Sequence, residues 1–151
     1  MTSSRVSGFK FHVGVTGFER QSSKRDALEK MKEETNLWLN KAKGNLGKAK
    51  DNLPLGHYDL VSFLSHQSAE MALKSFLIEM KGQFPRTHDL VRLGELAGLD
   101  SDMMKDCERL TYVYTESRYP DSGLWEHTRE ETENDIAIAQ RILEWITNRI
   151  S

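Results

Sequence analysis

The sequence is poor in cysteine and proline and has no long hydrophobic run. Its 151 residues include one cysteine, Cys107, and three prolines. A single cysteine cannot form an internal disulfide, and no cluster of Cys and His has the spacing of a zinc site. No apolar run approaches the ~18 residues that a membrane-spanning helix needs, and the first residues lack the apolar stretch of a signal peptide. These absences exclude a disulfide scaffold, a zinc module and a membrane protein, and we expect a soluble, cytoplasmic protein.

Two widespread catalytic motifs are also missing, because the sequence has neither a Gly-rich phosphate loop nor a nucleophile elbow.

The net charge is only −2, but it is distributed unevenly. Residues 1–52 carry 11 Lys and Arg against 6 Asp and Glu (net +5), whereas residues 53–151 carry 10 against 17 (net −7). Such a division either orients a charged partner or reflects two differently charged solvated faces. Neither half has the strongly basic character of a specific DNA-binding protein.

The first 22 residues differ from the rest of the chain. Between Phe9 and Val15, apolar residues alternate with Lys, His and Gly, a pattern typical of a short strand. A single strand has nothing to pair with inside this chain. We therefore expect residues 1–22 to be an N-terminal arm, flexible or packed across the body, and residues 23–151 to form one helical domain.

Apolar residues spaced three and four apart predict helices over most of the remaining chain. The first helix, from about Lys24, has the stripe Leu39, Ala42, Leu46, Ala49 and Leu53, and the last has Ile136, Ala139, Leu143, Ile146 and Ile150. Between them, helices are predicted from about 58 to 81, from an opening at Thr87-His88-Asp89 to about 96, and from 100 or 101 to before Pro120. The helix over 58–81 is apolar on most sides, which is typical of a central helix. We predict an all-α, antiparallel up-and-down bundle of four to five helices.

Polar residues interrupt the stripe of the predicted central helix. His66, Glu70 and Lys74 are four residues apart, so their side chains share one face. One interpretation is an internal Glu70–Lys74 ion pair with a hydrogen-bonded histidine. Another is a ligand-binding cleft or a subunit interface; a metal site would need a third ligand, which the sequence does not supply. Cys107, by contrast, shares an apolar stripe with Met103 and Leu110, so we interpret it as a core residue and not as a nucleophile.

A second polar group lies at the end of the predicted fourth helix: Tyr112, Tyr114, Arg118, Tyr119, Pro120 and Asp121. The guanidinium of Arg118 suits a phosphate group, because its planar fork matches two oxygens. Asp121 is the alternative partner, in a salt bridge across the turn. His127 lies nine positions after Arg118 and is a candidate to approach it. His88, at the start of the short third helix, either contributes to a site or forms a hydrogen bond in its loop.

Three segments resemble one family. They are His66–Lys74 (HQSAEMALK), Phe84–Leu90 (FPRTHDL) and Tyr114–Asp121 (YTESRYPD). Together, and in this order, they are similar to the HEPN domain, in particular to the small stand-alone prokaryotic HEPN proteins related to the C-terminal domain of sacsin. The resemblance covers roughly residues 34–150.

The resemblance implies a helical bundle that forms a homodimer, often encoded beside a minimal nucleotidyltransferase in a pair that behaves as toxin and antitoxin. It also implies that many members are metal-independent endoribonucleases, in which an arginine and a histidine separated by four to six residues cut RNA through the ribose 2′-hydroxyl. Here eight residues separate Arg118 from His127, so this sequence departs from the catalytic spacing.

We therefore expect a HEPN module that binds a nucleotide or an RNA phosphate and acts with a nucleotidyltransferase, without cofactor or metal. The expected cleft residues are His66, Glu70, Lys74, Tyr114, Arg118, Tyr119 and Asp121. The alternatives are an endoribonuclease toxin that uses Arg118 with His127 or His88, and a purely structural dimerisation domain. Loss of RNA cleavage in Arg118→Ala would favour the first alternative, and stabilisation by a nucleotide would exclude the second.

Overall fold

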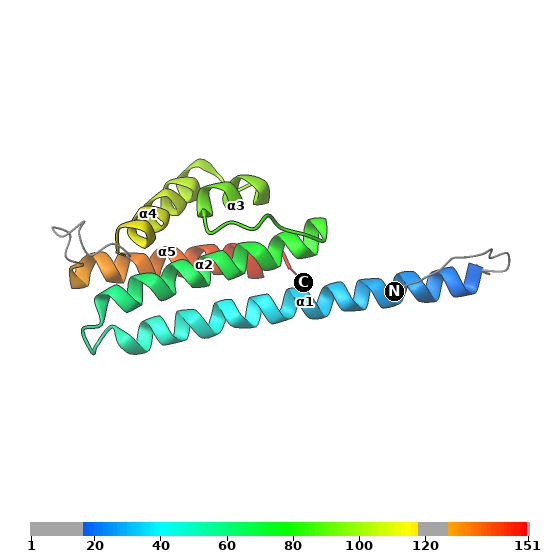
Figure 1. Cartoon of the computed structure of the whole chain (residues 1–151), viewed down its shortest axis with the longest axis horizontal. Helices are drawn as coiled ribbons and strands as arrows, with labels where there is room; N and C mark the ends of the chain where they lie inside the picture. Colours follow the sequence, from blue (N-terminus) through cyan, green and yellow to red (C-terminus); the bar gives the residue numbers. More distant parts are fainter. Residues whose placement is uncertain (1–16, 118–126, 151) are drawn as a thin grey trace.

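A computed structural model describes residues 17–117 and 127–150 of the chain, which form five helices (Figure 1). The helices are α1 (Gly17–Asn52), α2 (Tyr58–Lys81), α3 (Leu90–Ala97), α4 (Ser101–Ser117) and α5 (Arg129–Thr147). No strand occurs in these two ranges. The predicted all-α class is therefore confirmed.

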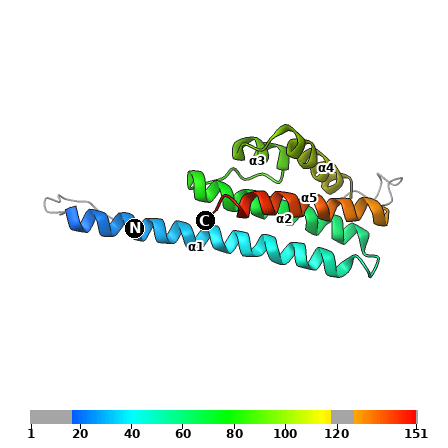
Figure 2. The same cartoon turned by 180° about the vertical axis from the view of Figure 1, so that it is seen from behind.

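Helix α2 is the centre of the bundle. It packs against all four other helices, most extensively against α1 and next against α5. Figures 1 and 2 show α1, α2 and α5 lying side by side, with α3 and α4 covering another side of α2. A helix with neighbours on so many sides needs apolar residues nearly all round. This arrangement explains the pattern that the sequence shows over residues 58–81.

The helix ends follow from local chemistry. Gly82 takes the left-handed conformation that ends α2 (φ 76°), and its N–H donates to the carbonyl oxygen of Ile78. The side chain of Asp89 accepts from the backbone N–H of Val91 and so caps α3. Thr128 caps α5 in the same way by accepting from the N–H of Glu131.

The start of α1 differs from the sequence prediction. The helix begins at Gly17, seven residues before Lys24. Residues 17–23 (GFERQSS) have no apolar residues at helical spacing, so the pattern does not mark a helix there. The alternating segment 9–15 lies outside the described residues.

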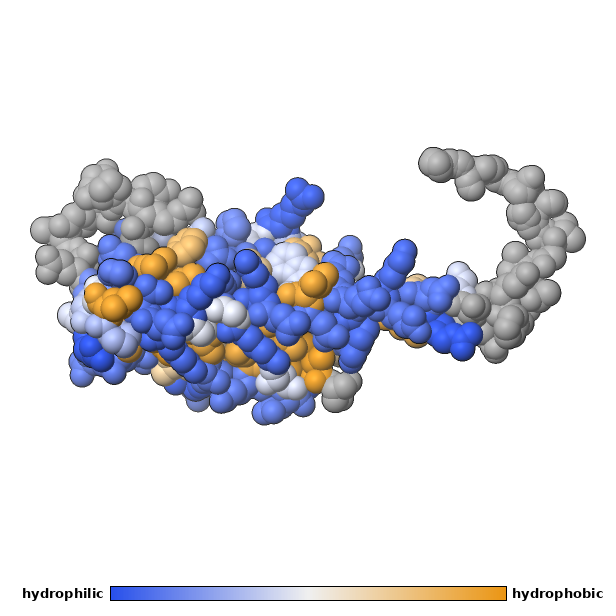
Figure 3. Space-filling model, turned by 90° about the horizontal axis from the view of Figure 1, so that it is seen from below, coloured by the Kyte–Doolittle hydropathy of each residue, from blue (hydrophilic) through white to orange (hydrophobic). Residues whose placement is uncertain are grey.

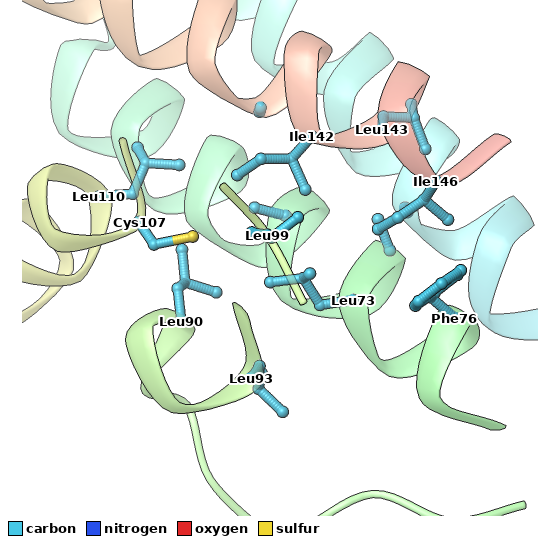
Figure 4. Close-up of a cluster of buried hydrophobic side chains, with 14 of the residues drawn as sticks. Leu73, Phe76, Leu90, Leu93, Leu99, Cys107, Leu110, Ile142, Leu143 and Ile146 are labelled. Atoms are coloured by element: carbon cyan, nitrogen blue, oxygen red, sulfur yellow. The ribbon is translucent and has the colours of Figure 1, made fainter. Parts of the chain in front are cut away.

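The core lies where all five helices meet, and α1 contributes Leu39, Ala42 and Leu46 to it. Figure 4 shows Leu73 of α2, Leu90 of α3, Cys107 of α4 and Ile142 of α5 around one buried cluster. Cys107 is fully buried. Burial raises the pKa of its thiol to about 12, because a thiolate would lose its hydration there. The interpretation of Cys107 as a core residue is confirmed.

The first part of α1 extends beyond the other helices (Figures 1 and 2). Residues 23–30 are all exposed. This projecting part is mostly hydrophilic on the face that Figure 3 shows. Among the described helices, none has a stretch long and apolar enough to cross a membrane.

Candidate functional site

The polar centre of the bundle is an ion pair on α2. The Nζ atom of Lys74 donates to Oε2 of Glu70 over 2.8 Å, and both side chains are buried. Helical geometry places residues i and i+4 on the same face, so this pair needs no other element to form. The predicted internal Glu70–Lys74 pair is present within one chain.

His88 contacts the same carboxylate from the connection between α2 and α3. Its Nδ1 atom lies 3.0 Å from Oε1 and 3.1 Å from Oε2 of Glu70. A carboxylate only accepts, so the proton of the imidazole sits on Nδ1. The side chain of His88 is 63% exposed, whereas that of Glu70 is 1% exposed. A buried carboxylate therefore fixes the ring and its tautomer, and leaves Nε2 for contact with a ligand.

His66 fixes the backbone of the same residue. Its Nε2 atom donates to the carbonyl oxygen of His88 over 3.0 Å. The ring of His66 is fully buried and stacks on Tyr114 of α4 with centroids 4.0 Å apart. Burial lowers the pKa of His66 to about 4, an effect that the nearby Glu70 carboxylate only partly offsets. His66 is consequently neutral near pH 7. It holds the backbone of His88 through its Nε2 atom and does not form an ion pair with Glu70.

Nδ1 of His66 has no hydrogen-bond partner among the described residues, and its distance to Oε1 of Glu70 is 3.8 Å. A neutral ring that donates from Nε2 carries a lone pair on Nδ1, so this atom cannot donate to the carboxylate. The carboxylate is left to its two actual donors, Lys74 and His88. The buried carboxylate of Glu70 therefore has two hydrogen-bond donors: the buried ammonium of Lys74 and the exposed imidazole of His88.

Two aromatic rings cover the buried end of this group. The Nζ atom of Lys74 lies 5.0 Å from the ring centroid of Phe84 and 5.8 Å from that of Trp38. The two rings meet edge to face with centroids 4.9 Å apart. A cation over aromatic faces is stabilised by the ring quadrupoles, and here the rings also keep water from the ion pair. We name Trp38, His66, Glu70, Lys74, Phe84, His88 and Tyr114 the open cluster.

A second polar group joins the other end of α2 to α4 and α5. The hydroxyl of Ser62 donates to Oδ2 of Asp135 over 2.8 Å, and both residues are fully buried. Arg109 of α4 approaches Oδ1 of Asp135 with its Nε atom at 3.5 Å and Glu131 with a terminal nitrogen at 3.3 Å. Burial raises the pKa of Asp135, while Ser62 and Arg109 act in the opposite direction.

His127 completes this second group. Its Nδ1 atom lies 3.2 Å from the hydroxyl oxygen of Ser62, which already donates its proton to Asp135, so the ring donates here. Its Nε2 atom lies 3.5 Å from Oδ1 of Asp59, and only 3% of its side chain is exposed. We name Ser62, Arg109, His127, Glu131 and Asp135 the closed cluster. Both nitrogens of His127 face protein atoms, which favours a structural role over contact with a ligand.

The structure brings together five of the residues singled out in the sequence: His66, Glu70, Lys74, His88 and Tyr114. Arg118, Tyr119 and Asp121 lie outside the described residues. His127 belongs to the closed cluster, where its ring nitrogens contact Ser62 and Asp59. Within the described ranges, no group of three or more His, Cys, Asp and Glu side chains has an arrangement that would hold a metal ion.

Sequence reasoning missed the aromatic cover of Trp38 and Phe84 and the whole buried Ser62–Asp135 pair. The signals were nevertheless present. Ser62 stands four residues before His66 and so continues the polar stripe of α2. Asp135 stands three residues before Ile138 and interrupts an apolar face of the last helix. Because an aspartate is rarely buried without a partner, this position indicates a buried polar contact.

Comparison with known proteins gives consistent matches. The family model of the HEPN domain matches residues 35–150. A crystal structure of TT1696 from Thermus thermophilus is similar, with 31% identity and a TM-score of 0.69, over 76% of this chain and 97% of that one. A crystal structure of ST0689, an archaeal HEPN homologue, has 31% identity and a TM-score of 0.66, over 78% of this chain and 98% of that one. Curated proteins give no match.

Proposed function

The chain belongs to the HEPN domain family, and from this premise we propose that it binds the phosphate of a nucleotide or of RNA at the exposed edge of the open cluster. The observation that carries the proposal is His88. Its imidazole is mostly exposed, yet its Nδ1 atom is held by the buried carboxylate of Glu70. A ring fixed in this way presents Nε2 in one direction and loses little conformational entropy when it binds.

The charges of the open cluster suit a phosphate. Lys74 and Glu70 neutralise each other, so the protonated form of His88 would bring one positive charge to the edge of the site. A protonated imidazole donates from both nitrogens, one to Glu70 and one to a phosphate oxygen. Arg118 is the second proposed phosphate ligand; in sequence it follows Tyr114 of the cluster by four residues.

An endoribonuclease is the second candidate, because a histidine fixed by a carboxylate also suits proton transfer. In that case His88 is the better partner for Arg118, since both nitrogens of His127 already face side chains of the chain itself. The same ring would move a proton at the ribose 2′-hydroxyl, and Arg118 would stabilise the charged phosphate.

The proposed setting is a homodimer that pairs with a minimal nucleotidyltransferase, in the manner of a toxin and its antitoxin. The likeness of the three sequence segments to the HEPN family supports this part of the proposal. Co-expression with a minimal nucleotidyltransferase from the same genome, followed by copurification through a tag on one partner, tests it. Recovery of the untagged partner is expected, and its absence from the eluate would contradict the pairing.

The test of the site uses purified protein in EDTA with a fluorescent single-stranded RNA. We expect His88→Ala and Arg118→Ala each to weaken binding by about tenfold or more, the size of a lost charge-assisted hydrogen bond. His57→Ala is the matched control, because His57 is exposed and lies in the connection between α1 and α2. Equal binding by all three variants and the wild type would contradict the proposal, and binding by none would leave a structural dimerisation domain.

The same samples separate the two candidates. Intact RNA after incubation with folded wild-type protein supports a binding module. RNA that the wild type shortens, but that stays intact with His88→Ala or with Arg118→Ala, supports the endoribonuclease. Circular dichroism of each variant shows whether it is folded.

A further inference from the structure

A hollow is bordered by part of the connection that carries His88. Its volume is about 340 Å³, and it is lined by Lys81, Gln83, Phe84, Pro85, Arg92 and Leu96. These residues come from the last turn of α2, from the connection itself and from α3. The volume lies in the lower part of the range of small-ligand sites.

The charged residues of this hollow have one sign. Lys81 and Arg92 line it, and no Asp or Glu does. Neither cation forms an ion pair or a side-chain hydrogen bond within the part of the chain that the structure describes, in contrast to Lys74, Arg109, Arg129 and Arg141, which all pair with carboxylates. Two such cations beside one another form a site that attracts an anion.

The rest of the lining is suited to an apolar or planar group. Phe84, Pro85 and Leu96 supply apolar surface, and the amide of Gln83 supplies both a donor and an acceptor. Phe84 meets Trp38 edge to face, and the Nζ atom of Lys74 lies 5.0 Å from its ring centroid, so these contacts hold the ring in place. An aromatic ring fixed by the core is a suitable partner for a nucleobase, because every base has a π-face.

We propose that this hollow binds one nucleoside phosphate, with the phosphate at Lys81 and Arg92 and the base against Phe84, Pro85 and Leu96. The ligand class rests on the proposed function, but the residues are different. The connection joins the two places: from Gln83 to His88 it spans at most ~20 Å, and it carries a further cationic residue, Arg86. The nucleoside phosphate comes either from a free nucleotide or from a strand of RNA that continues to His88.

The first experiment measures binding of ATP and of a short single-stranded RNA to wild type and to the double variant Lys81→Ala/Arg92→Ala. We expect at least tenfold weaker binding of whichever probe the wild type binds. For RNA, the dependence of log affinity on log salt also becomes shallower by about 0.7 for each phosphate contact that is lost. Lys48→Ala/Arg25→Ala is the matched control, because it removes the same two residue types from exposed positions of α1.

The probe that binds identifies the source. ATP binding assigns the hollow to a free nucleotide; RNA binding without ATP binding assigns it to a strand. Inorganic tripolyphosphate is the third probe, and it should bind more weakly than ATP because it lacks a base. Equal affinities for ATP and tripolyphosphate would overturn the proposed contact of the base with Phe84, Pro85 and Leu96.

The outcomes also separate this inference from the proposed function. Weaker binding in Lys81→Ala/Arg92→Ala with unchanged binding in His88→Ala supports the hollow and contradicts the role of His88. The reverse pattern overturns the hollow and leaves the role of His88 intact. Equal weakening in the control double variant would show unspecific attraction, and it would overturn the inference as well.

Discussion

The open and closed clusters contain the same kinds of groups and differ in exposure. Each places a histidine and an arginine or lysine around a fully buried carboxylate of the bundle. In the open cluster the histidine, His88, is 63% exposed. In the closed cluster the histidine, His127, is 3% exposed and has protein atoms at both ring nitrogens.

The difference follows from the elements that carry the two histidines. His88 stands in a connection that is held from inside, by its ring to Glu70 and by its backbone to His66. His127 stands just before α5, and its two ring nitrogens face Ser62 and Asp59 of α2. A carboxylate–histidine contact is therefore no sign of a ligand site unless the second nitrogen reaches solvent.

The largest effect is expected from Lys74→Met, which leaves the carboxylate of Glu70 buried without its lysine. Removing one partner of a buried ion pair costs about 3 kcal/mol of the free energy of unfolding, even though His88 still donates to Glu70. Chemical denaturation measures this loss. The double variant Glu70→Leu/Lys74→Met should recover most of it, because an apolar pair of similar volume is close to neutral. A loss below about 1 kcal/mol would show that the pair is solvated.

A change of pH should distinguish the clusters by sign. Lowering the pH from 7 to 5 is expected to cost about 2 kcal/mol through His66, whose pKa burial lowers from 6.5 to about 4. The unfolded chain takes up a proton in this range that folded His66 does not, so the stability that neutral His66 contributes is complete above pH 6.5 and is lost as the pH falls.

Asp135 of the closed cluster acts in the opposite direction. Burial raises its pKa, so its contribution is complete below its ordinary pKa and is lost as the pH rises through the folded value. Denaturation midpoints at pH 7 and pH 5 for wild type and His66→Gln test the statement about His66. The variant should lose clearly less stability than the wild type, and an equal loss would rule out His66 as the cause.

A smaller effect is expected from Ser62→Ala, which removes the hydroxyl that donates to Asp135. The cost is about 1.5 kcal/mol, because Arg109 still approaches the carboxylate. Affinity for RNA should not change, since the closed cluster faces no ligand. Denaturation and fluorescence anisotropy on the same sample measure both. Weaker RNA binding without loss of stability would move the site to the closed cluster.

The smallest effect is expected from Thr128→Ala, beside His127. The hydroxyl of Thr128 accepts from the backbone N–H of Glu131 and caps α5. Loss of an N-cap costs about 1 kcal/mol. Thermal unfolding detects it, and Thr128→Ser, which keeps the hydroxyl, should match the wild type. A full loss in the serine variant would attribute the effect to the methyl group instead.

The sequence predicts the fold well because helix periodicity and end signals are local. The bounds of α2 agree with the pattern over 58–81, and Gly82 ends the helix as expected. The i, i+4 spacing likewise predicts the contact of Glu70 with Lys74. The start of α1 could not be predicted in this way, since residues 17–23 have no apolar stripe.

Contacts between distant segments explain the remaining differences. His88 meets Glu70 only because the connection after α2 returns along it, and Trp38 meets Phe84 across α1 and the same connection. No spacing in the sequence specifies such contacts. Likewise, His88 and His127 differ in exposure through their neighbours in space, and the sequence presents them as equal candidates.

The most direct test of the account follows the rings of the histidines by NMR while a single-stranded RNA is added in EDTA. The Cε1–Hε1 signal of His88, assigned with His88→Ala, should shift with the RNA concentration and saturate, because its Nε2 atom contacts the ligand. The signal of His127, assigned with His127→Gln, should stay in place. A shift of His127 with an unmoved His88 would contradict the account.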